Sequence, residues 1–417
     1  MSTARTTIGA IMVSVVLLGA SSALQSTVVA LRAGILGFSD TTIGLIISAY
    51  FLGFIGGSFL VVGFVRSVGY VRTFAALAAL AAAAVLAHTI VQLPLAWFVF
   101  RAVHGFALAG VLVVVESWLN GCSSTYNRGR VLSVYSLVYL AAMGGGQPLL
   151  GVFSASRFEI FAVVSMLMSL SLIPISLVQV TGTPEVDREP VRPARTFRRS
   201  PLAAVGVFVS GATTEALWGL APRYAQQIDL PEAAIGSFML AISVGALALQ
   251  WPLGWFSDRR DRRYAILIAA GAAAVAAAVF AGSGAGPQVF ALAFLLGAFV
   301  MPLYSLCIAL MNDELTPGEM VGAASALVLF YGIGSAIGPY LASLAMSAFG
   351  RGGLFLYLSV LLGAFFLYSL ARLQLVPRLP RRHRERYHSY PRTTFAAFDL
   401  LRKRATRRGR ASDTDTG

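Results

Sequence analysis

The chain has 417 residues, of which 57% are hydrophobic and only 12% are charged. Soluble domains are about a quarter charged, so this composition excludes a soluble enzyme or binding module and predicts a protein that lies in lipid. The formal net charge of +14 does not indicate a nucleic-acid-binding protein, because the arginines lie between and after apolar runs instead of along one face.

A membrane-spanning helix needs about 20 apolar residues, so the chain has room for roughly a dozen spans joined by short loops. Each span must be a helix, because a helix satisfies its own backbone hydrogen bonds in lipid. The first run is longer than a signal-peptide core, so we expect it to remain as an uncleaved helix. The sequence predicts an all-α membrane protein with transmembrane helices at residues 8–31, 43–65, 72–93, 95–119, 130–153, 158–180, 201–224, 233–256, 264–283, 287–311, 320–346 and 353–375.

Arginines fall in alternate loops along the chain. One side carries most of them, at Arg66, Arg72, Arg128, Arg130, residues 181–200, residues 259–263 and the C-terminal tail. The other side carries chiefly Arg32, Arg157, Arg223 and Arg351. Because cytoplasmic loops are rich in basic residues, this alternation predicts a multi-pass protein of the cytoplasmic (inner) cell membrane with both termini in the cytoplasm.

Several residues recur in order at one offset, as Gly19 with Gly211, Gly44 with Gly236 and Gly53 with Gly245 (211 − 19 = 236 − 44 = 245 − 53 = 192). Such a repeat indicates two pseudo-symmetric six-helix bundles related by an axis along the membrane normal. The expected domains are an N-terminal bundle at 1–180, a cytoplasmic linker at 181–200, a C-terminal bundle at 201–375 and a basic cytoplasmic tail at 376–417.

Two loops and three helices carry recognisable motifs. The loop after the eighth span reads "GWFSDRRDRR" from Gly254 to Arg263, and the loop after the second reads "GFVRSVGYVR" from Gly63 to Arg72. The helical motifs are "RAVHG" in the fourth span, "GGGQPLLG" in the fifth and "GSAIGP" in the eleventh.

These motifs resemble those of the major facilitator superfamily (MFS) of secondary transporters, and the chain looks most like its YcaD-like branch. The second-half loop matches the superfamily's cytoplasmic signature, whereas the first-half copy has Arg66 where the acidic residue belongs. The resemblance covers residues 8–375 and implies the MFS fold of twelve helices. It also implies that the first helices of successive three-helix units line a central cavity.

Glu215 is the strongest candidate for proton coupling, because a carboxylate in the middle of a span faces a water-filled cavity or a partner. The alternative is a hydrogen bond to a neighbouring helix. Arg101 needs an anion, carbonyl groups or an aromatic face, and the resemblance implies a role for it in proton coupling, with direct pairing to Glu215 as one arrangement. The alternative is a purely structural Arg101 held by backbone carbonyls. His104 shares the Arg101 face and is either a titrating group or a packed, hydrogen-bonded one.

Other polar side chains in the spans are candidates for lining the substrate cavity, with ordinary contacts between helices as the alternative. These are Gln25, Tyr139, Gln147, Thr214, Trp218, Tyr304 and Tyr331. Small residues and prolines in two spans predict close helix packing, and in the family such motifs are associated with antiport. They are Gly144 and Pro148 in the fifth span and Gly334, Gly338 and Pro339 in the eleventh.

Charged residues at the cytoplasmic ends of the spans predict a gate network that holds the two halves in one state. Its second-half members are Gly254, Asp258, Arg259, Arg262, Arg263 and Asp313, and its first-half members are Arg66, Gly69, Arg72 and Glu116. We expect Glu116 to pair with Arg66 or Arg72.

The predicted function is secondary active transport of a small solute by alternating access, coupled to protons. The alternative is a membrane sensor or receptor on a transporter scaffold, without net transport. The sequence has no phosphate-binding Gly-x-x-x-x-Gly-Lys loop and no metal-ligand or nucleophile motif, which disfavours a pump or an enzyme. We expect a monomer that contacts membrane lipid, with no cofactor, no metal and no nucleic acid.

Overall fold

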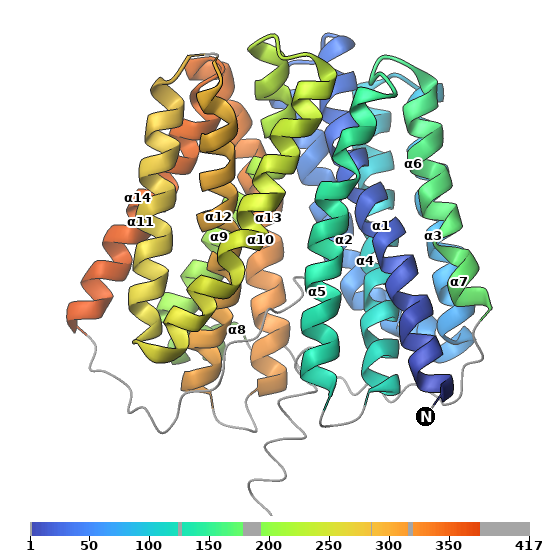
Figure 1. Ribbon diagram of the computed structural model, residues 1–417, viewed down its shortest axis with the longest axis horizontal. Coiled ribbons are helices and arrows are strands. Elements are labelled where there is room, and N and C mark those ends of the chain that lie inside the picture. Colours follow the sequence, from blue (N-terminus) through green and yellow to red (C-terminus); the bar gives the residue numbers. More distant parts are fainter. Residues whose placement is uncertain (1, 124–126, 178–192, 285, 316–319, 376–417) are drawn as a thin grey trace, which may run out of the picture.

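The computed structural model describes residues 2–123, 127–177, 193–284, 286–315 and 320–375 (Figure 1). Most of the predicted linker and all of the predicted tail therefore lie outside the described residues. The described chain is helical, with the elements α1 (Ser2–Ile35), α2 (Asp40–Val68), α3 (Tyr70–Ile90), α4 (Pro94–Cys122), α5 (Arg128–Gly145), η1 (Gln147–Gly151), α6 (Phe158–Leu170), α7 (Leu172–Ser176), α8 (Pro193–Arg199), α9 (Pro201–Gln227), α10 (Glu232–Arg259), α11 (Arg262–Gly282), α12 (Gln288–Glu314), α13 (Met320–Phe349) and α14 (Gly353–Leu375).

Eleven spans in the described chain are long and apolar enough to cross a membrane, and α5 completes the predicted set of twelve. The fifth span is less apolar at its start, where Arg128 and Arg130 lie, and it narrows into the 3-10 helix η1 around Pro148. The sixth span divides into α6 and α7 at Ser171, three residues before Pro174. Both interruptions follow from proline, which has no backbone donor and clashes with the preceding turn.

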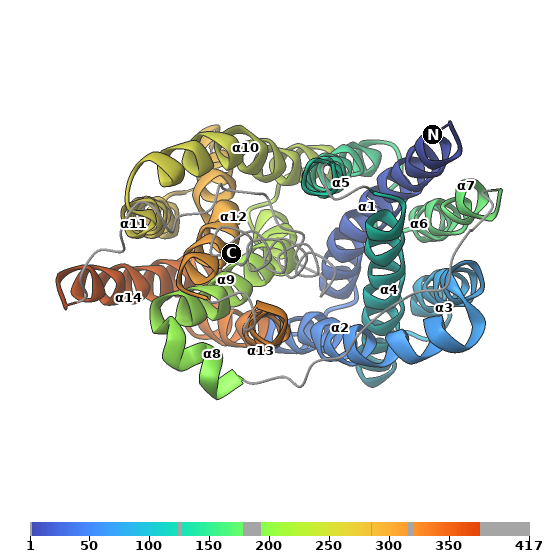
Figure 2. The ribbon, with the colours of Figure 1, turned by 90° about the horizontal axis from the view of Figure 1, so that it is seen from below.

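The contacts between helices repeat in the two halves, α1 to α7 and α9 to α14. In the first half α2 packs on α4, α3 on α4 and α6, and α1 on α5 and α6. In the second half α10 packs on α12, α11 on α12 and α14, and α9 on α13 and α14. Exchanging the halves leaves this pattern unchanged, so the predicted pseudo-symmetric pair of six-helix bundles is confirmed. Figure 2 shows the two bundles side by side, with α1, α2, α5, α9, α10 and α13 in the region between them.

Glycines at equivalent positions hold the repeated helix pairs together. A Cβ at Gly53 would collide with the backbone carbonyl of Ala102 on α4, and a Cβ at Gly245 would collide with that of Phe294 on α12. Only glycine allows the two backbones to approach so closely. The repeated glycines therefore mark the α2–α4 and α10–α12 crossings.

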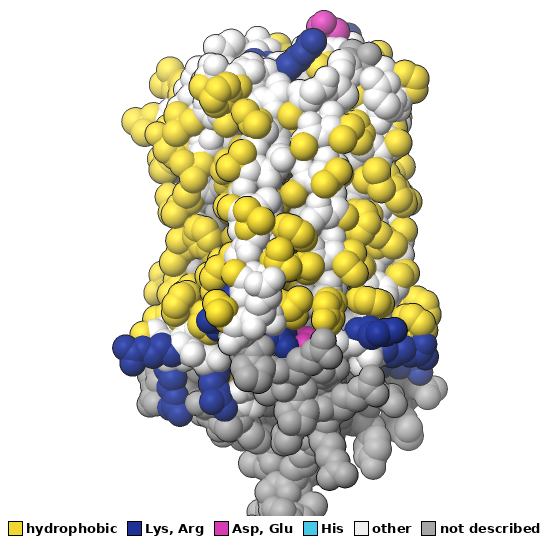
Figure 3. All heavy atoms as spheres, turned by 90° about the vertical axis from the view of Figure 1, so that its left-hand side faces the viewer, with side chains coloured by type: hydrophobic (Ala, Val, Ile, Leu, Met, Phe, Trp, Pro, Cys, Tyr) yellow, Lys and Arg dark blue, Asp and Glu magenta, His cyan; other side chains and the backbone are white. Residues whose placement is uncertain are grey.

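The two ends of the bundle differ in charge. We call the end at which α1 begins and α14 ends the basic end, and the other the opposite end. Figure 3 shows apolar side chains over the height of the bundle and Lys or Arg side chains gathered near the basic end. Exposed arginines there include Arg66, Arg72, Arg130, Arg259 and Arg260.

Candidate solute cavity and the contacts between the halves

A cavity with an empty volume of about 970 Å³ lies between the two halves. Its walls come from α1, α2, α4 and α5 in the first half and from α9 and α13 in the second. The lining residues are Ser22, Ala23, Ser26, Ile47, Tyr50, Phe51, Phe54, Ile55, Ser58, Phe59, Arg101, Leu112, Tyr139, Met143, Glu215, Trp218, Gly219, Val328, Tyr331 and Gly332.

Glu215 and Trp218 reach the cavity from one face of α9. The carboxylate of Glu215 is half-buried and accepts a hydrogen bond of 2.6 Å from the hydroxyl of Tyr331 on α13. Residues three apart on a helix are neighbours, so Trp218 lines the wall one turn beyond Glu215. Tyr304 on α12 packs against Tyr331, with ring centroids 4.9 Å apart.

Arg101 also lines the cavity, from α4, and the protein contacts part of its guanidinium, while Nε has no hydrogen-bond partner among the described residues. The side chain is 2% exposed, donates to Gln25 Oε1 at 3.2 Å and lies 4.7 Å from the centre of the Tyr50 ring. An arginine needs such partners away from water, and an aromatic face with an amide oxygen supplies them.

The two buried histidines of the first half lie behind the cavity wall. His104 is fully buried with its ring 5.8 Å from that of Tyr50, and His88 packs its ring 5.1 Å from that of Trp97. His88 Nδ1 hydrogen-bonds to the carbonyl of Ala84 at 2.7 Å. Neither histidine is among the lining residues.

The structure brings some of the predicted cavity residues together and separates others. Tyr139, Trp218 and Tyr331 line the cavity with Arg101 and Glu215. Four other predicted cavity residues are buried and do not line the cavity. They are Gln25, Gln147, Thr214 and Tyr304. Gln147 accepts a hydrogen bond of 3.0 Å from Thr27, so this pair connects η1 to α1.

The internal repeat relates lining residues of the two halves, including Ser22, which the prediction missed. Tyr139 and Tyr331 are equivalent (331 − 139 = 192), and both pack on the repeated glycines Gly19 and Gly211. The lining residue Ser22 stands at the position equivalent to Thr214 (214 − 22 = 192). The aromatic wall on α2, from Tyr50 to Phe59, gave no such signal, because aromatic residues are common in any transmembrane helix.

The Gly-Pro segments lie where helices approach closely. A Cβ at Gly144 on α5 would lie 2.6 Å from Ser243 Cβ on α10, so this glycine permits contact between the halves. Gly334 and Gly338 on α13 pack against the α9 backbone at Phe208 and Ala212. Pro148 lies in η1, whereas Pro339 lies inside α13.

An ionic cluster joins the halves at the opposite end, and we call it the Asp40 cluster. Ser39 caps α2 and places Asp40 in its first turn. The Asp40 carboxylate pairs with Arg223 Nε of α9 at 2.9 Å and accepts from Gln227 Nε2 at 2.9 and 3.2 Å. Arg223 also donates to Gln226 at 2.6 Å, and Gln226 donates to the carbonyl of Leu31 in α1 at 3.2 Å.

Glu232 makes a second contact between the halves at this end. It lies in the first turn of α10 and accepts hydrogen bonds from the backbone N–H of Ala155 at 2.7 Å and the hydroxyl of Ser154 at 2.9 Å. Thr41 and Ser347 add a hydroxyl pair at 3.0 Å between α2 and α13. These contacts join the two halves at the opposite end.

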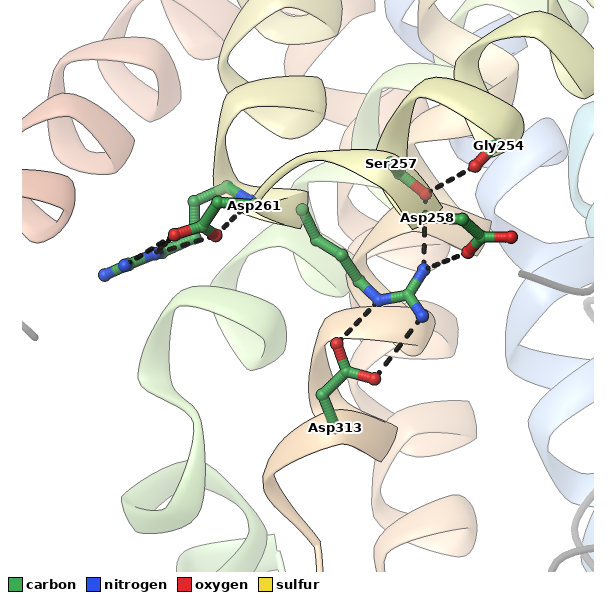
Figure 4. Close-up of polar contacts among 7 residues, drawn as sticks. Gly254, Ser257, Asp258, Asp261 and Asp313 are labelled. Atoms are coloured by element: carbon green, nitrogen blue, oxygen red, sulfur yellow. Dashed lines mark hydrogen bonds and ion pairs between the residues drawn. The ribbon is translucent and has the colours of Figure 1, made fainter. Parts of the chain in front are cut away.

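The predicted second-half gate residues lie at the basic end, and the contacts that the structure describes for them stay within the second half. Arg262 of α11 donates to Asp313 of α12 at 2.7 Å and to Asp258 of α10 at 3.1 Å (Figure 4). Arg262 and Asp313 are buried, at 1% and 3% exposed. Gly254 accepts a hydrogen bond from Ser257, which in turn accepts one from Arg262. These bonds connect three helices of the same half.

The remaining gate residues have individual contacts. Arg263 pairs with Asp261 at 2.7 Å, and Arg259 lies 3.7 Å above the centre of the Trp255 ring. Glu116 is fully buried and accepts a hydrogen bond of 3.0 Å from Tyr135. Arg66 and Arg72 are exposed on either side of Gly69, whose φ of 86° suits glycine at the end of α2.

The chain matches the Major Facilitator Superfamily over residues 11–206 and again over residues 203–407, so each half carries the family pattern. It therefore belongs to this superfamily of multi-pass membrane transporters, as its motifs predicted. Among the described residues, no group of three or more His, Cys, Asp and Glu side chains is placed to hold a metal ion.

The relatives by sequence are described as uncharacterized MFS-type transporters. One from Yersinia pestis (strain Pestoides F) is 26% identical over 334 residues, covering 80% of this chain and 86% of that protein. YcaD of Escherichia coli O6:K15:H31 (strain 536 / UPEC) is 25% identical over 346 residues, covering 82% and 89%. The resemblance to the YcaD-like branch is thus confirmed.

Solved transporters share the fold at much lower sequence identity. The nucleoside transporter NupG has a TM-score of 0.72 at 13% identity over 90% of this chain and 99% of its own. The D-xylose-proton symporter has a TM-score of 0.71 at 14% identity over 91% and 99%. A bacterial homologue of the lysosomal transporter Spinster, in an inward-facing and unoccupied conformation, has a TM-score of 0.67 at 12% identity over 96% and 97%.

Proposed function

We propose that the protein is a secondary transporter that moves a small solute across the cytoplasmic membrane by alternating access, coupled to protons. The observation that carries the proposal is the cavity lined by both halves, with the halves joined by the Asp40 cluster at one end. Rocking the halves about the cavity breaks those contacts and opens the other side. We propose no enzymatic role and a monomeric protein.

The orientation follows from charge. Exposed arginines gather at the basic end, and cytoplasmic loops of membrane proteins carry the excess of basic residues. We therefore assign the basic end, with both termini, to the cytoplasm. In this orientation the Asp40 cluster closes the outer side, and the solute enters or leaves this conformation from the cytoplasm. The domain limits at residues 1–180, 181–200, 201–375 and 376–417 stay predictions.

Proton coupling is assigned to Glu215. Its carboxylate is half-buried in the cavity and hydrogen-bonded to Tyr331, which is a setting where a carboxyl group gains or loses a proton as the cavity changes sides. Moving one proton with the field across a membrane releases about 2.3 kcal/mol per 100 mV.

The test uses proteoliposomes with a pH-sensitive dye inside. Addition of a transported solute from a broad panel moves protons in the wild type, whereas Glu215→Gln loses the coupled proton movement and stays folded. Glu159→Gln is the matched control, since Glu159 is an exposed carboxylate in the first turn of α6. Unchanged coupling in Glu215→Gln would remove this residue from the mechanism. Absence of flux across the whole panel would favour a sensor on a transporter scaffold.

A further inference from the structure

The cavity wall is dominated by aromatic and aliphatic side chains. From α2 it receives Tyr50, Phe51, Phe54 and Phe59, and Trp218 faces them from α9. The described lining residues include no Asn, Gln, Asp, Lys or His, and their polar groups are three serine and three tyrosine hydroxyls, the Trp218 indole, Arg101 and Glu215. A site that pairs every hydroxyl of a sugar or a nucleoside needs many polar groups, because an unpaired polar group in a closed site costs affinity. This wall instead suits a solute with a largely apolar body.

The two charges in the wall are presented unequally. Arg101 is 2% exposed, with its guanidinium covered by the Tyr50 ring and hydrogen-bonded to Gln25. Glu215 is half-buried and lines the cavity. It is therefore the more exposed of the two charges, although the charge of Arg101 also acts on it.

Aromatic rings surround that anion. Tyr331 holds the carboxylate through its hydroxyl at 2.6 Å, Tyr304 supports Tyr331 from behind, and Trp218 lies one turn along α9 from Glu215. Ring faces attract cations, most strongly where water is excluded, and a carboxylate among them adds a full charge. The combination is a site for a positively charged group on an apolar body.

We propose that the substrates are lipophilic monovalent cations, with Glu215 and Trp218 as the residues that select for charge. This inference rests on the proposed transport function and names its substrate class. The residues equivalent to Glu215 and Trp218 in the first half are Ala23 and Ser26 (215 − 23 = 218 − 26 = 192), so the site for the cation lies on the second-half wall. Because a proton on Glu215 removes the negative charge, lowering the pH weakens cation binding.

The test compares two ions of nearly identical shape and opposite charge, on purified wild-type protein in detergent. Radiolabelled tetraphenylphosphonium and radiolabelled tetraphenylborate are the probes in separate samples, because the two ions associate when mixed, and unlabelled tetraphenylphosphonium, uridine and D-xylose are the competitors of the cation. We expect saturable binding of the cation, binding of tetraphenylborate that is at least about tenfold weaker, and no competition by uridine or xylose. Binding falls as the pH is lowered.

Variants separate the charge from the shape of the site. Glu215→Gln weakens tetraphenylphosphonium binding by about tenfold or more and abolishes its pH dependence, whereas Glu159→Gln changes neither. Trp218→Phe keeps most of the affinity and Trp218→Ala loses it. Size-exclusion chromatography and thermal unfolding of each variant exclude misfolding as the cause.

The outcomes also distinguish this inference from the transport proposal. Tighter binding of tetraphenylborate than of tetraphenylphosphonium, or displacement of the probe by uridine or xylose, would overturn the assignment of substrate class. Flux of another solute in proteoliposomes without binding of the cation would refute the inference and leave transport standing. Glu215-dependent cation binding without any flux would support the site and refute transport.

Discussion

Replacing Asp40 by asparagine tests whether the Asp40 cluster holds the opposite end closed. The carboxylate bonds to Arg223 and Gln227, which both lie on α9, so the cluster exists only while the halves are in contact at this end. Asparagine keeps the size and one acceptor oxygen but removes the charge. The closed state therefore loses stability while the open state, in which these groups are apart, is unaffected.

The size of the effect follows from the burial of the pair. The side chains of Arg223 and Asp40 are 19% and 15% exposed. The pair is therefore more buried than the surface ion pairs that contribute about 0.2–1 kcal/mol to stability. Hydrogen bonds to charged groups contribute about 1.5–3 kcal/mol. An intermediate loss of about 1.4 kcal/mol shifts the ratio of open to closed states about tenfold.

The assay is labelling of a single cysteine in the cavity. Ser26→Cys places a thiol of similar size on the wall, in a background with Cys122→Ser and Cys307→Ala. A membrane-impermeant maleimide added at the outer face of oriented membranes should label Ser26→Cys about tenfold faster when Asp40→Asn is present.

Asp229→Asn is the matched control, because Asp229 is an exposed carboxylate at the same end, in the turn after α9. It removes the same charge without breaking a contact between the halves. An unchanged labelling rate in Asp40→Asn, or an equal increase in Asp229→Asn, would refute the reasoning that this cluster is a latch.

Two further predictions concern the stability of the bundles, each measured by thermal unfolding of detergent-purified protein. Arg262→Gln removes the buried cation that pairs with Asp313 and should lower stability by about 3 kcal/mol, whereas Arg66→Gln, at an exposed arginine, should have little effect. Gly53→Ala drives a methyl group into the α4 backbone and should cost about 1–3 kcal/mol, whereas Gly63→Ala, which faces open space, should be neutral or stabilising.

Much of the fold could be predicted from the sequence, because lipid leaves a chain few choices. Apolar runs had to become helices, and the repeated glycines had to mark equivalent helix crossings, as Gly53 and Gly245 do. The prediction failed to anticipate the breaks in the fifth and sixth spans, where Pro148 and Pro174 alter the helix. A proline alone does not indicate such a break, because Pro222, Pro252 and Pro302 lie inside unbroken helices. Whether a proline breaks a helix depends on its packing, which the sequence does not state.

The site was harder to predict than the fold for a related reason. Glu215 and Arg101 were selected as charges within apolar runs, and both line the cavity. We expected the gate among charged residues of the motifs at the basic end, and that expectation stays a prediction. The described residues also show contacts between the halves at the opposite end, around Asp40 and Glu232. Those residues were not distinctive in the sequence, because a charged residue at the end of a span is ordinary. Their importance arises from partners about 80 to 190 positions away in the chain.

The chemistry of the cavity lies in the departures from the repeat. Where the halves agree, as at Tyr139 and Tyr331 or at Gly19 and Gly211, the residues shape the cavity and pack the helices. At one position where the halves differ, the second half has Glu215 and the first half has Ala23. In the proposed mechanism, the two similar lobes provide the two states, and the carboxylate on one lobe is the common binding place of the solute and the proton. The proposed coupling therefore rests on lining positions at which the duplicated halves differ, while the positions that pack the helices are alike.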